Sequence, residues 1–350
     1  MFLIDNKLMK RLISVRLCRL IGPLLPAAVA VLALLPVLVV AMSNDPRHWI
    51  NRMHIAVDST NYHGTLVRLR QSSSATADAQ SETFRIYHRA VDGEVSERLV
   101  GMDGDGFEVI RSNSETICVF PERRSVVVDP RANSSKSPLA AGLPAYSETM
   151  EGHYTFAVIA DERIAGRKAK VLQIAAADEY RYGYRIWLDT KTAMPLKSQL
   201  RSSNGQSLLE EVMFAEITLQ AEVDPLMVVS AYDISKFDRV MPQANKVVEL
   251  STEDISWAAV KLPPGFVLTA VHHESMPDAA EPRLHLVYTD GLASVSVFID
   301  SAEPDQYEGA EVMGATHAFT VMVGGQVVTA IGQVPAETAR QIASLMRYQP

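Results

Sequence analysis

The sequence is poor in residues that form covalent cross-links. Its two cysteines are Cys18 and Cys118, and Cys18 lies in an N-terminal stretch typical of export signals. If that stretch is removed, Cys118 remains alone, which excludes an intrachain disulfide. We expect Cys118 to behave as a small buried apolar side chain within residues 116–120, because a reactive thiol needs a basic and exposed setting.

Motifs for catalysis, metal binding and phosphate binding are also lacking. No G-x-S-x-G or H-E-x-x-H stretch occurs. Residues 103–106 (DGDG) lack the later oxygen ligands of a calcium loop and predict a hairpin turn. His272-His273-Glu274 has no partner at metal-ligand spacing, and we expect a solvated loop there. The sequence therefore predicts a protein that is not an enzyme and carries no cofactor or metal. An envelope hydrolase is the weakest alternative, because only scattered His and Asp residues support it.

The overall charge is also informative. The formal net charge is -8 over 350 residues, which argues against nucleic acid as a partner. The length allows two domains with separate cores.

The N-terminus has the pattern of a targeting segment. Basic residues between Lys7 and Arg19 precede an apolar run over 20–42, and residues 41–43 (AMS) offer a cleavage site. The run approaches the length of a membrane-spanning helix, although Pro23, Pro26 and Pro36 interrupt it. We expect residues 1–43 to be a cleaved export signal, with an uncleaved inner-membrane anchor as the alternative. In both cases the remainder lies outside the cytoplasm.

The residues from 163 to 214 alternate in polarity with period two, which predicts antiparallel strands in a meander. Tyr182, Tyr184, Ile186 and Leu188 share one predicted face, and Leu196, Ser198 and Leu200 share one face of the next strand. Asn204-Gly205 predicts a hairpin. Similar runs occur from residue 65 onward and bring the number of predicted short strands to about ten. This number predicts a large antiparallel sheet or an open barrel.

Helical spacing occurs at both ends of the mature chain. Asn44-Asp45-Pro46 predicts the start of an amphipathic helix ending near Asp58. Pro335 predicts the start of a last helix with Ala339, Ile342, Ala343 and Met346 on one stripe. We expect an α+β fold with a β domain over residues 44–222, a linker over 223–246 and a smaller C-terminal domain over 247–350, in which an antiparallel sheet packs on the last helix.

A curved sheet with one helix leaves part of its concave face uncovered, and an uncovered apolar concavity is a candidate ligand site. The residues predicted to line it are Phe84, Ile86, Val109, Ile186 and Leu188.

Several short motifs are spread along both predicted domains. They are NYHGT at 61–65, YHRAVDGEVSERL at 87–99, MDG at 102–104, IAGR at 164–167, RYGYRIWLD at 181–189, MPLKS at 194–198, LPPGF at 262–266, YTDGLASVSV at 288–297 and parts of 323–343. These stretches resemble the RseB/MucB family of periplasmic regulators of the envelope-stress sigma factor. Their order and spacing cover nearly the whole mature chain.

The resemblance implies a half-open barrel like that of the lipoprotein carrier LolA, with a lipid-binding concavity. It also implies a partner, the periplasmic domain of a membrane-spanning anti-sigma factor, which the protein would shield from regulated proteolysis until lipid or lipopolysaccharide releases it. A periplasmic lipid or lipoprotein carrier is the alternative function, and self-association is left open.

Overall fold

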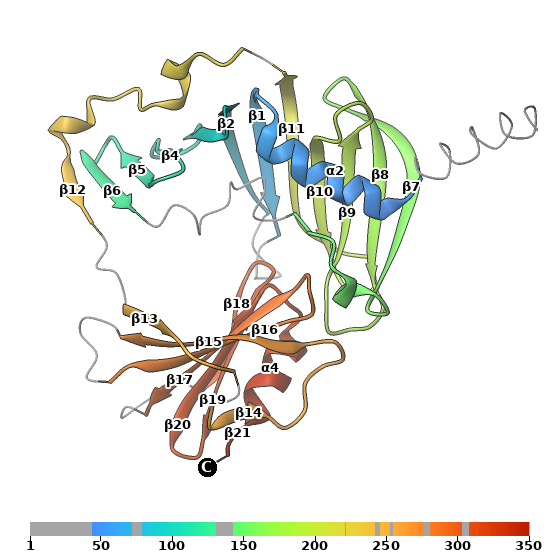
Figure 1. Cartoon of the computed structure of the whole chain (residues 1–350), viewed down its shortest axis with the longest axis vertical. Helices are drawn as coiled ribbons and strands as arrows, with labels where there is room; N and C mark the ends of the chain where they lie inside the picture. Colours follow the sequence, from blue (N-terminus) through green and yellow to red (C-terminus); the bar gives the residue numbers. More distant parts are fainter. Residues whose placement is uncertain are drawn as a thin grey trace, which may run out of the picture. The chain divides into compact units, whose positions relative to one another are not determined.

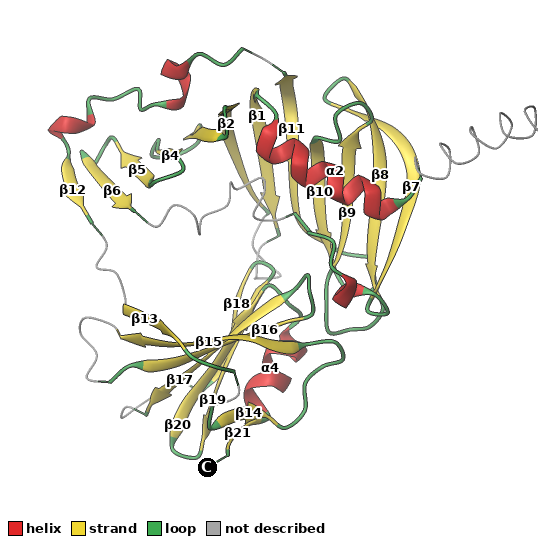
Figure 2. Ribbon diagram, viewed as in Figure 1, coloured by secondary structure: helices red, strands yellow, loops and turns green. Residues whose placement is uncertain are grey.

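The described part of the chain consists of two large β-sheets and few helices (Figures 1 and 2). The computed structural model describes residues 44–71, 79–130, 143–220, 222–241, 246–252, 255–275, 281–302 and 308–349. From Pro46 onward the chain forms one unit, separate from Met1–Asp45. The predicted fold class is confirmed, while the predicted domain boundaries stay a prediction.

The larger sheet has 12 strands in the order β12-β6-β5-β4-β3-β2-β1-β11-β10-β9-β8-β7. Its two end strands, β12 and β7, are not paired with each other, so the sheet is open. All neighbouring strands in this sheet are antiparallel except β12 and β6, which are parallel. The strands are β1 (Tyr62–Arg70), β2 (Gln80–Val91), β3 (Glu94–Gly101), β4 (Glu108–Arg111), β5 (Thr116–Phe120), β6 (Ser125–Asp129), β7 (Tyr154–Ile164), β8 (Arg167–Ala176), β9 (Gly183–Asp189), β10 (Pro195–Arg201), β11 (Leu208–Leu219) and β12 (Asp238–Val240).

The strand alternation predicted over β9 is confirmed, but one residue of β10 lies on the other face. Tyr184, Ile186 and Leu188 pack in one apolar cluster and Trp187 packs in another. Leu196 joins the Trp187 cluster, not the face of Leu200. The reason is a register shift between Pro195 and Lys197, because a β-bulge reverses the alternation of side chains.

Helix α2 (Pro46–Ser59) lies across the strands β7–β11 (Figure 1). Its buried residues, Trp49, Ile50, Met53, Ala56 and Val57, are those that the helical spacing predicts. Most of them join the main apolar core with side chains of the larger sheet, among them Leu66 and Phe214. Burial of each large apolar side chain contributes about 1.5–3 kcal/mol, so this packing fixes the helix on the sheet.

The segment between the two sheets is packed against the larger one along most of its described length. It contains two 3-10 helices, η3 (Pro225–Val228) and η4 (Ile234–Lys236), and then β12. Ile234 and Phe237 contact an apolar cluster on β4–β6. Glu108 of β4, which is 2% exposed, accepts hydrogen bonds from the Ser230 hydroxyl at 2.8 Å and from the guanidinium of Arg98. This part of the predicted linker is therefore held by a buried carboxylate.

We expect Glu108→Ala to release this segment, because Arg98 loses its buried ionic partner and Ser230 its acceptor. The loss of stability is about 1–3 kcal/mol, measured by urea unfolding. Limited proteolysis should cut residues 230–241 faster in the variant. Exposed Glu122→Ala is the matched control, and equal cleavage of both variants would contradict the expectation.

The smaller sheet has seven strands in the order β13-β15-β16-β17-β20-β19-β18. They are β13 (Lys246–Glu249), β15 (Val267–Ser275), β16 (Arg283–Thr289), β17 (Ser294–Ser301), β18 (Gly309–Met313), β19 (Thr316–Val323) and β20 (Gln326–Gly332). β14 (Trp257–Ala259) pairs with β21 (Met346–Tyr348).

Helix α4 (Ala336–Ser344) packs on the smaller sheet. Ala339, Ile342 and Ala343 are fully buried against strand residues such as Leu286 and Val297, which confirms most of the predicted stripe. Met346 is buried as well but lies in β21, because the helix ends at Ser344 and the chain then extends.

The predicted targeting segment 1–43 lies outside the described residues. So do residues 72–78 of the stretch 71–80, for which the lack of periodicity in the sequence predicts a loop. Within the described ranges, no helix has the length and apolarity needed to cross a membrane. Cys118 is half-buried, not buried as expected, and burial raises the pKa of its thiol.

Candidate functional site

The five residues predicted to line a lipid concavity lie in or beside the main core. Ile86, Ile186 and Leu188 are fully buried in the cluster that contains the α2 side chains. Phe84 and Val109 are half-buried and pack against the same cluster. Their face of the sheet is thus the one that α2 crosses, and their contact with a lipid stays a prediction.

The same face continues beyond α2 along β4–β6. Val109, Cys118 and Val127 are in register on these three strands and are each half-buried. In Figure 1 the strands β4, β5 and β6 lie outside the part of the sheet that α2 crosses. No helix of the described residues lies over this row of apolar side chains, so it is the part of the sheet best suited to an apolar ligand.

A buried ion pair joins the larger sheet to the smaller one. The Arg181 guanidinium donates to Asp290 Oδ2 at 2.6 Å, and both side chains are fully buried. The Tyr154 hydroxyl donates to the same oxygen at 2.8 Å. Arg181 also donates to Asp178 and to the carbonyl of Pro264. A buried charge is tolerated only when it is paired and hydrogen-bonded, so these contacts hold the two sheets in one arrangement.

Local sequence explains how Asp290 serves two purposes. Its Oδ1 accepts from the backbone N–H groups of Leu292 and Ala293 and so closes the turn between β16 and β17. Its Oδ2 is left for Arg181 and Tyr154. Burial, together with the charge of Asp290, raises the pKa of Tyr154 well above its ordinary value, so the hydroxyl stays a donor at neutral pH.

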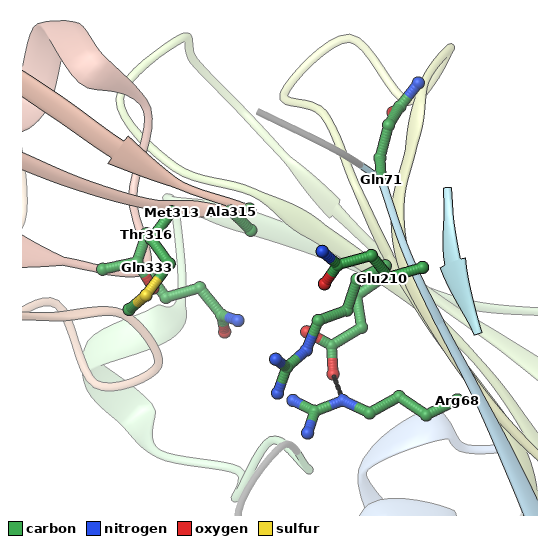
Figure 3. Close-up of a pocket in the computed structure, with 10 residues that line it drawn as sticks. Arg68, Gln71, Glu210, Met313, Ala315, Thr316 and Gln333 are labelled. Carbon is green, nitrogen blue, oxygen red and sulfur yellow. Dashed lines mark hydrogen bonds and ion pairs between the residues drawn. The ribbon is translucent and has the colours of Figure 1, made fainter. Parts of the chain in front are cut away.

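A polar pocket lies between β1 and the turn from β18 to β19, and we call it the arginine pocket (Figure 3). Its volume is about 350 Å³. Figure 3 shows Gln333, which follows β20 of the smaller sheet, pointing toward the ion pair of Arg68 with Glu210. Arg68 Nε lies 2.8 Å from Glu210 Oε1 in that pair. The lining residues are Arg68, Arg70, Gln71, Gln80, Glu210, Met313, Gly314, Ala315, Thr316 and Gln333.

A second, smaller pocket of about 260 Å³ shares Gln333 with the first. Three tyrosines line it, Tyr154, Tyr182 and Tyr184, with Leu143 and Leu292. Burial raises the pKa of Tyr182 to about 12. Near pH 7 these phenols are neutral donors, so this pocket is suited to an uncharged group.

His272-His273-Glu274, predicted as a solvated loop, lies in β15, and that prediction was wrong. Cross-strand pairing with β16 explains it, since His272 lies opposite His285 and Glu274 opposite Arg283. Glu274 accepts from Arg283 at 2.9 Å and lies 2.7 Å from His285 Nδ1. Short-range sequence reasoning missed these partners because they belong to the next strand.

Ser296, His285 and Glu274 form a hydrogen-bonded chain, with 2.9 Å between Ser296 Oγ and His285 Nε2. Such a chain resembles a hydrolytic triad. However, Ser296 lies inside β17, which is paired on both sides with β16 and β20. Backbone N–H groups committed to the sheet are not free to stabilise an oxyanion, so the arrangement is structural.

We expect stability to fall as the pH drops through about 6.5, the ordinary pKa of histidine. Burial lowers the pKa of His285, against the opposing effect of Glu274; His272 and Arg283 also lower it. The unfolded chain therefore takes up a proton at a higher pH than the folded one, and protonation favours unfolding. Urea unfolding at pH 7.5 and 5.5 measures the effect. In His285→Gln the difference should shrink, whereas the control His273→Gln, at an exposed position of β15, should keep it. An unchanged difference in His285→Gln contradicts this assignment.

Two family models match almost all of the described chain. The model described as the MucB/RseB N-terminal domain matches residues 45–232, and the MucB/RseB C-terminal domain matches residues 251–347. The chain belongs to the MucB/RseB family. The family predicted from the motifs is thereby confirmed.

The sequence is similar to those of named proteins over most of their length. The Sigma factor AlgU regulatory protein MucB of Pseudomonas aeruginosa is 32% identical over 314 residues, which cover 87% of this chain and 91% of that protein. The Sigma-E factor regulatory protein RseB of Escherichia coli K12 is 24% identical over 309 residues, which cover 85% of this chain and 89% of that protein.

Solved structures of MucB are also similar. The complex of Pseudomonas aeruginosa MucA and MucB matches with a TM-score of 0.66 at 28% identity, covering 87% of this chain and 99% of that chain. A crystal structure of MucB matches with a TM-score of 0.56 at 28% identity, and the match covers 87% of this chain and 98% of that chain.

Sequence reasoning missed the residues that join the sheets. Arg181 and Asp290 both lie in motifs that carry the family resemblance, RYGYRIWLD and YTDGLASVSV. The charged residues at the start of RYGYRIWLD and in the turn of YTDGLASVSV were a usable signal. The arginine pocket had no such signal, because Arg68 and Arg70 have the spacing of any exposed strand face.

Proposed function

We propose that this MucB/RseB protein is a periplasmic negative regulator of a sigma-E-type envelope stress response. It binds the periplasmic domain of a membrane-spanning anti-sigma factor and acts by binding, not by catalysis. The observation that carries the proposal is the family match over both sheets, together with solved complexes of the relative MucB with MucA.

We further propose that binding shields the anti-sigma factor from regulated proteolysis and that lipid or a lipopolysaccharide fragment reverses it. The apolar row Val109, Cys118 and Val127 supports a lipid site on the larger sheet. The buried contact of Arg181 with Asp290 supports coupling, because a ligand that favours one arrangement of the sheets changes the affinity for the second ligand by the same factor.

A binding experiment tests the regulator. The chain from residue 44 onward is titrated against the labelled periplasmic domain of the source organism's anti-sigma factor, with and without lipopolysaccharide. We expect binding without lipid and its loss when lipid is added. Protease digestion of the labelled domain should slow when the regulator is bound, and absence of binding under both conditions would refute the proposal.

Val127→Asp provides a matched variant for the lipid part. A carboxylate in the apolar row should weaken release by lipid without weakening binding of the anti-sigma domain. Exposed Val91→Asp serves as control. Transfer of lipid to acceptor vesicles, with no binding of the anti-sigma domain, would instead indicate the carrier function.

A further inference from the structure

We propose that the arginine pocket binds the carboxylate of an acidic side chain in the partner segment and that Arg70 receives it. This inference rests on the proposed function, since the occupant is part of the anti-sigma factor's periplasmic domain. The strand register, the lining chemistry and the volume of the pocket support it.

The strand register leaves Arg70 of β1 without a counter-charge among the described residues. Arg70 lies opposite Glu210 of β11 and opposite Gln80 of β2. Glu210, however, pairs with the diagonal neighbour Arg68, its Oε1 lying 2.8 Å from Arg68 Nε. The side chain of Arg70 forms no hydrogen bond or ion pair with any residue that the structure describes. Its guanidinium is therefore available to an incoming anion.

The other lining groups complete a site for a carboxylate. The amides of Gln71, Gln80 and Gln333 and the hydroxyl of Thr316 can all donate. A planar carboxylate accepts two parallel hydrogen bonds from one guanidinium, the strongest geometry available to these groups. On β2 the nearest carboxylate in register, Glu82, lies opposite Arg68 and not opposite Arg70.

The volume and polarity of the pocket favour a side chain over a lipid. A cavity of about 350 Å³ is near the lower end of the range for ligand pockets, about 300–1,000 Å³. Its walls carry charged and amide side chains, and an acyl chain would leave these without partners. An acidic residue of an extended peptide fits both constraints. Because the walls come from both sheets, the occupant also contacts both.

Charge substitutions with opposite expected signs test the proposal. Arg70→Gln should weaken binding of the labelled anti-sigma domain about tenfold or more, since a charge-assisted hydrogen bond is lost. Arg70→Lys should recover part of the affinity at low salt. Glu210→Gln should tighten binding severalfold, because it leaves Arg68 unneutralised. A destabilised fold does not tighten binding, so these opposite signs separate recognition from misfolding.

The matched control is Arg239→Gln, because Arg239 is an exposed arginine whose side chain has no partner among the described residues. We expect the Arg239→Gln variant to bind the anti-sigma domain with the same affinity as the unsubstituted protein. Replacing each Asp and Glu of the anti-sigma domain by its amide should reveal one position whose effect disappears in the Arg70→Gln background.

The outcomes are distinguishable. If the unsubstituted protein does not bind the anti-sigma domain, the proposed function fails and the inference falls with it. If it binds, but Arg70→Gln behaves like Arg239→Gln, only the inference is overturned. If Arg70→Gln instead abolishes binding to phosphatidylglycerol vesicles and leaves the anti-sigma domain bound, the pocket takes a lipid phosphate and the inference is also overturned.

Discussion

Replacing Arg181 with methionine is expected to lower the free energy of unfolding by about 3–5 kcal/mol. The variant leaves the fully buried Asp290 carboxylate without its cation and the Pro264 carbonyl without a donor. An uncompensated buried charge is among the most destabilising changes in a folded protein. Urea unfolding measures the change, and the slope of the transition shows whether both sheets still unfold together.

Two control variants isolate the charge. The double variant Arg181→Met/Asp290→Asn removes both buried charges, while the Asn side chain can still accept from the turn amides of Leu292 and Ala293. It should recover part of the lost stability. Arg340→Met removes an exposed pair with Glu337 and should change stability by no more than about 0.5 kcal/mol. A loss below about 1 kcal/mol in Arg181→Met would show that the pair is not required.

Replacing Ile186 with alanine is expected to cost about 2–5 kcal/mol in lipid-free protein. Ile186 has 0% exposure and packs in the cluster formed with α2, so truncation leaves a cavity that the surrounding sheet cannot fill. Thermal or urea unfolding after lipid extraction measures the loss.

Val109→Ala is the matched control, because Val109 is half-buried at the margin of the same cluster. It should cost clearly less than Ile186→Ala in lipid-free protein. If Ile186 instead lined an open lipid site, its truncation would cost little without lipid and would mainly weaken lipid binding.

The sequence by itself determined most of the strands and the two helices. Alternation with period two predicted most strands of both sheets, and the spacing of Trp49, Ile50 and Met53 predicted α2 and its buried face. These features follow from local backbone geometry, which sets the direction of each side chain within a few residues. The motifs also identified the family, because their order and spacing are properties of the chain alone.

Only the tertiary structure decided which side chains meet. Arg181 and Asp290 are 109 positions apart, and their pairing depends on how two sheets pack. Among the described residues the Arg70 side chain is left without a partner, because Glu210 bonds to the diagonal Arg68 instead of the residue opposite. A bulge moved Leu196 to the other face, and pairing with β16 made a strand of His272–Glu274. Local periodicity carries no information about register or long-range contact, and these decide where charges are buried, paired or left available.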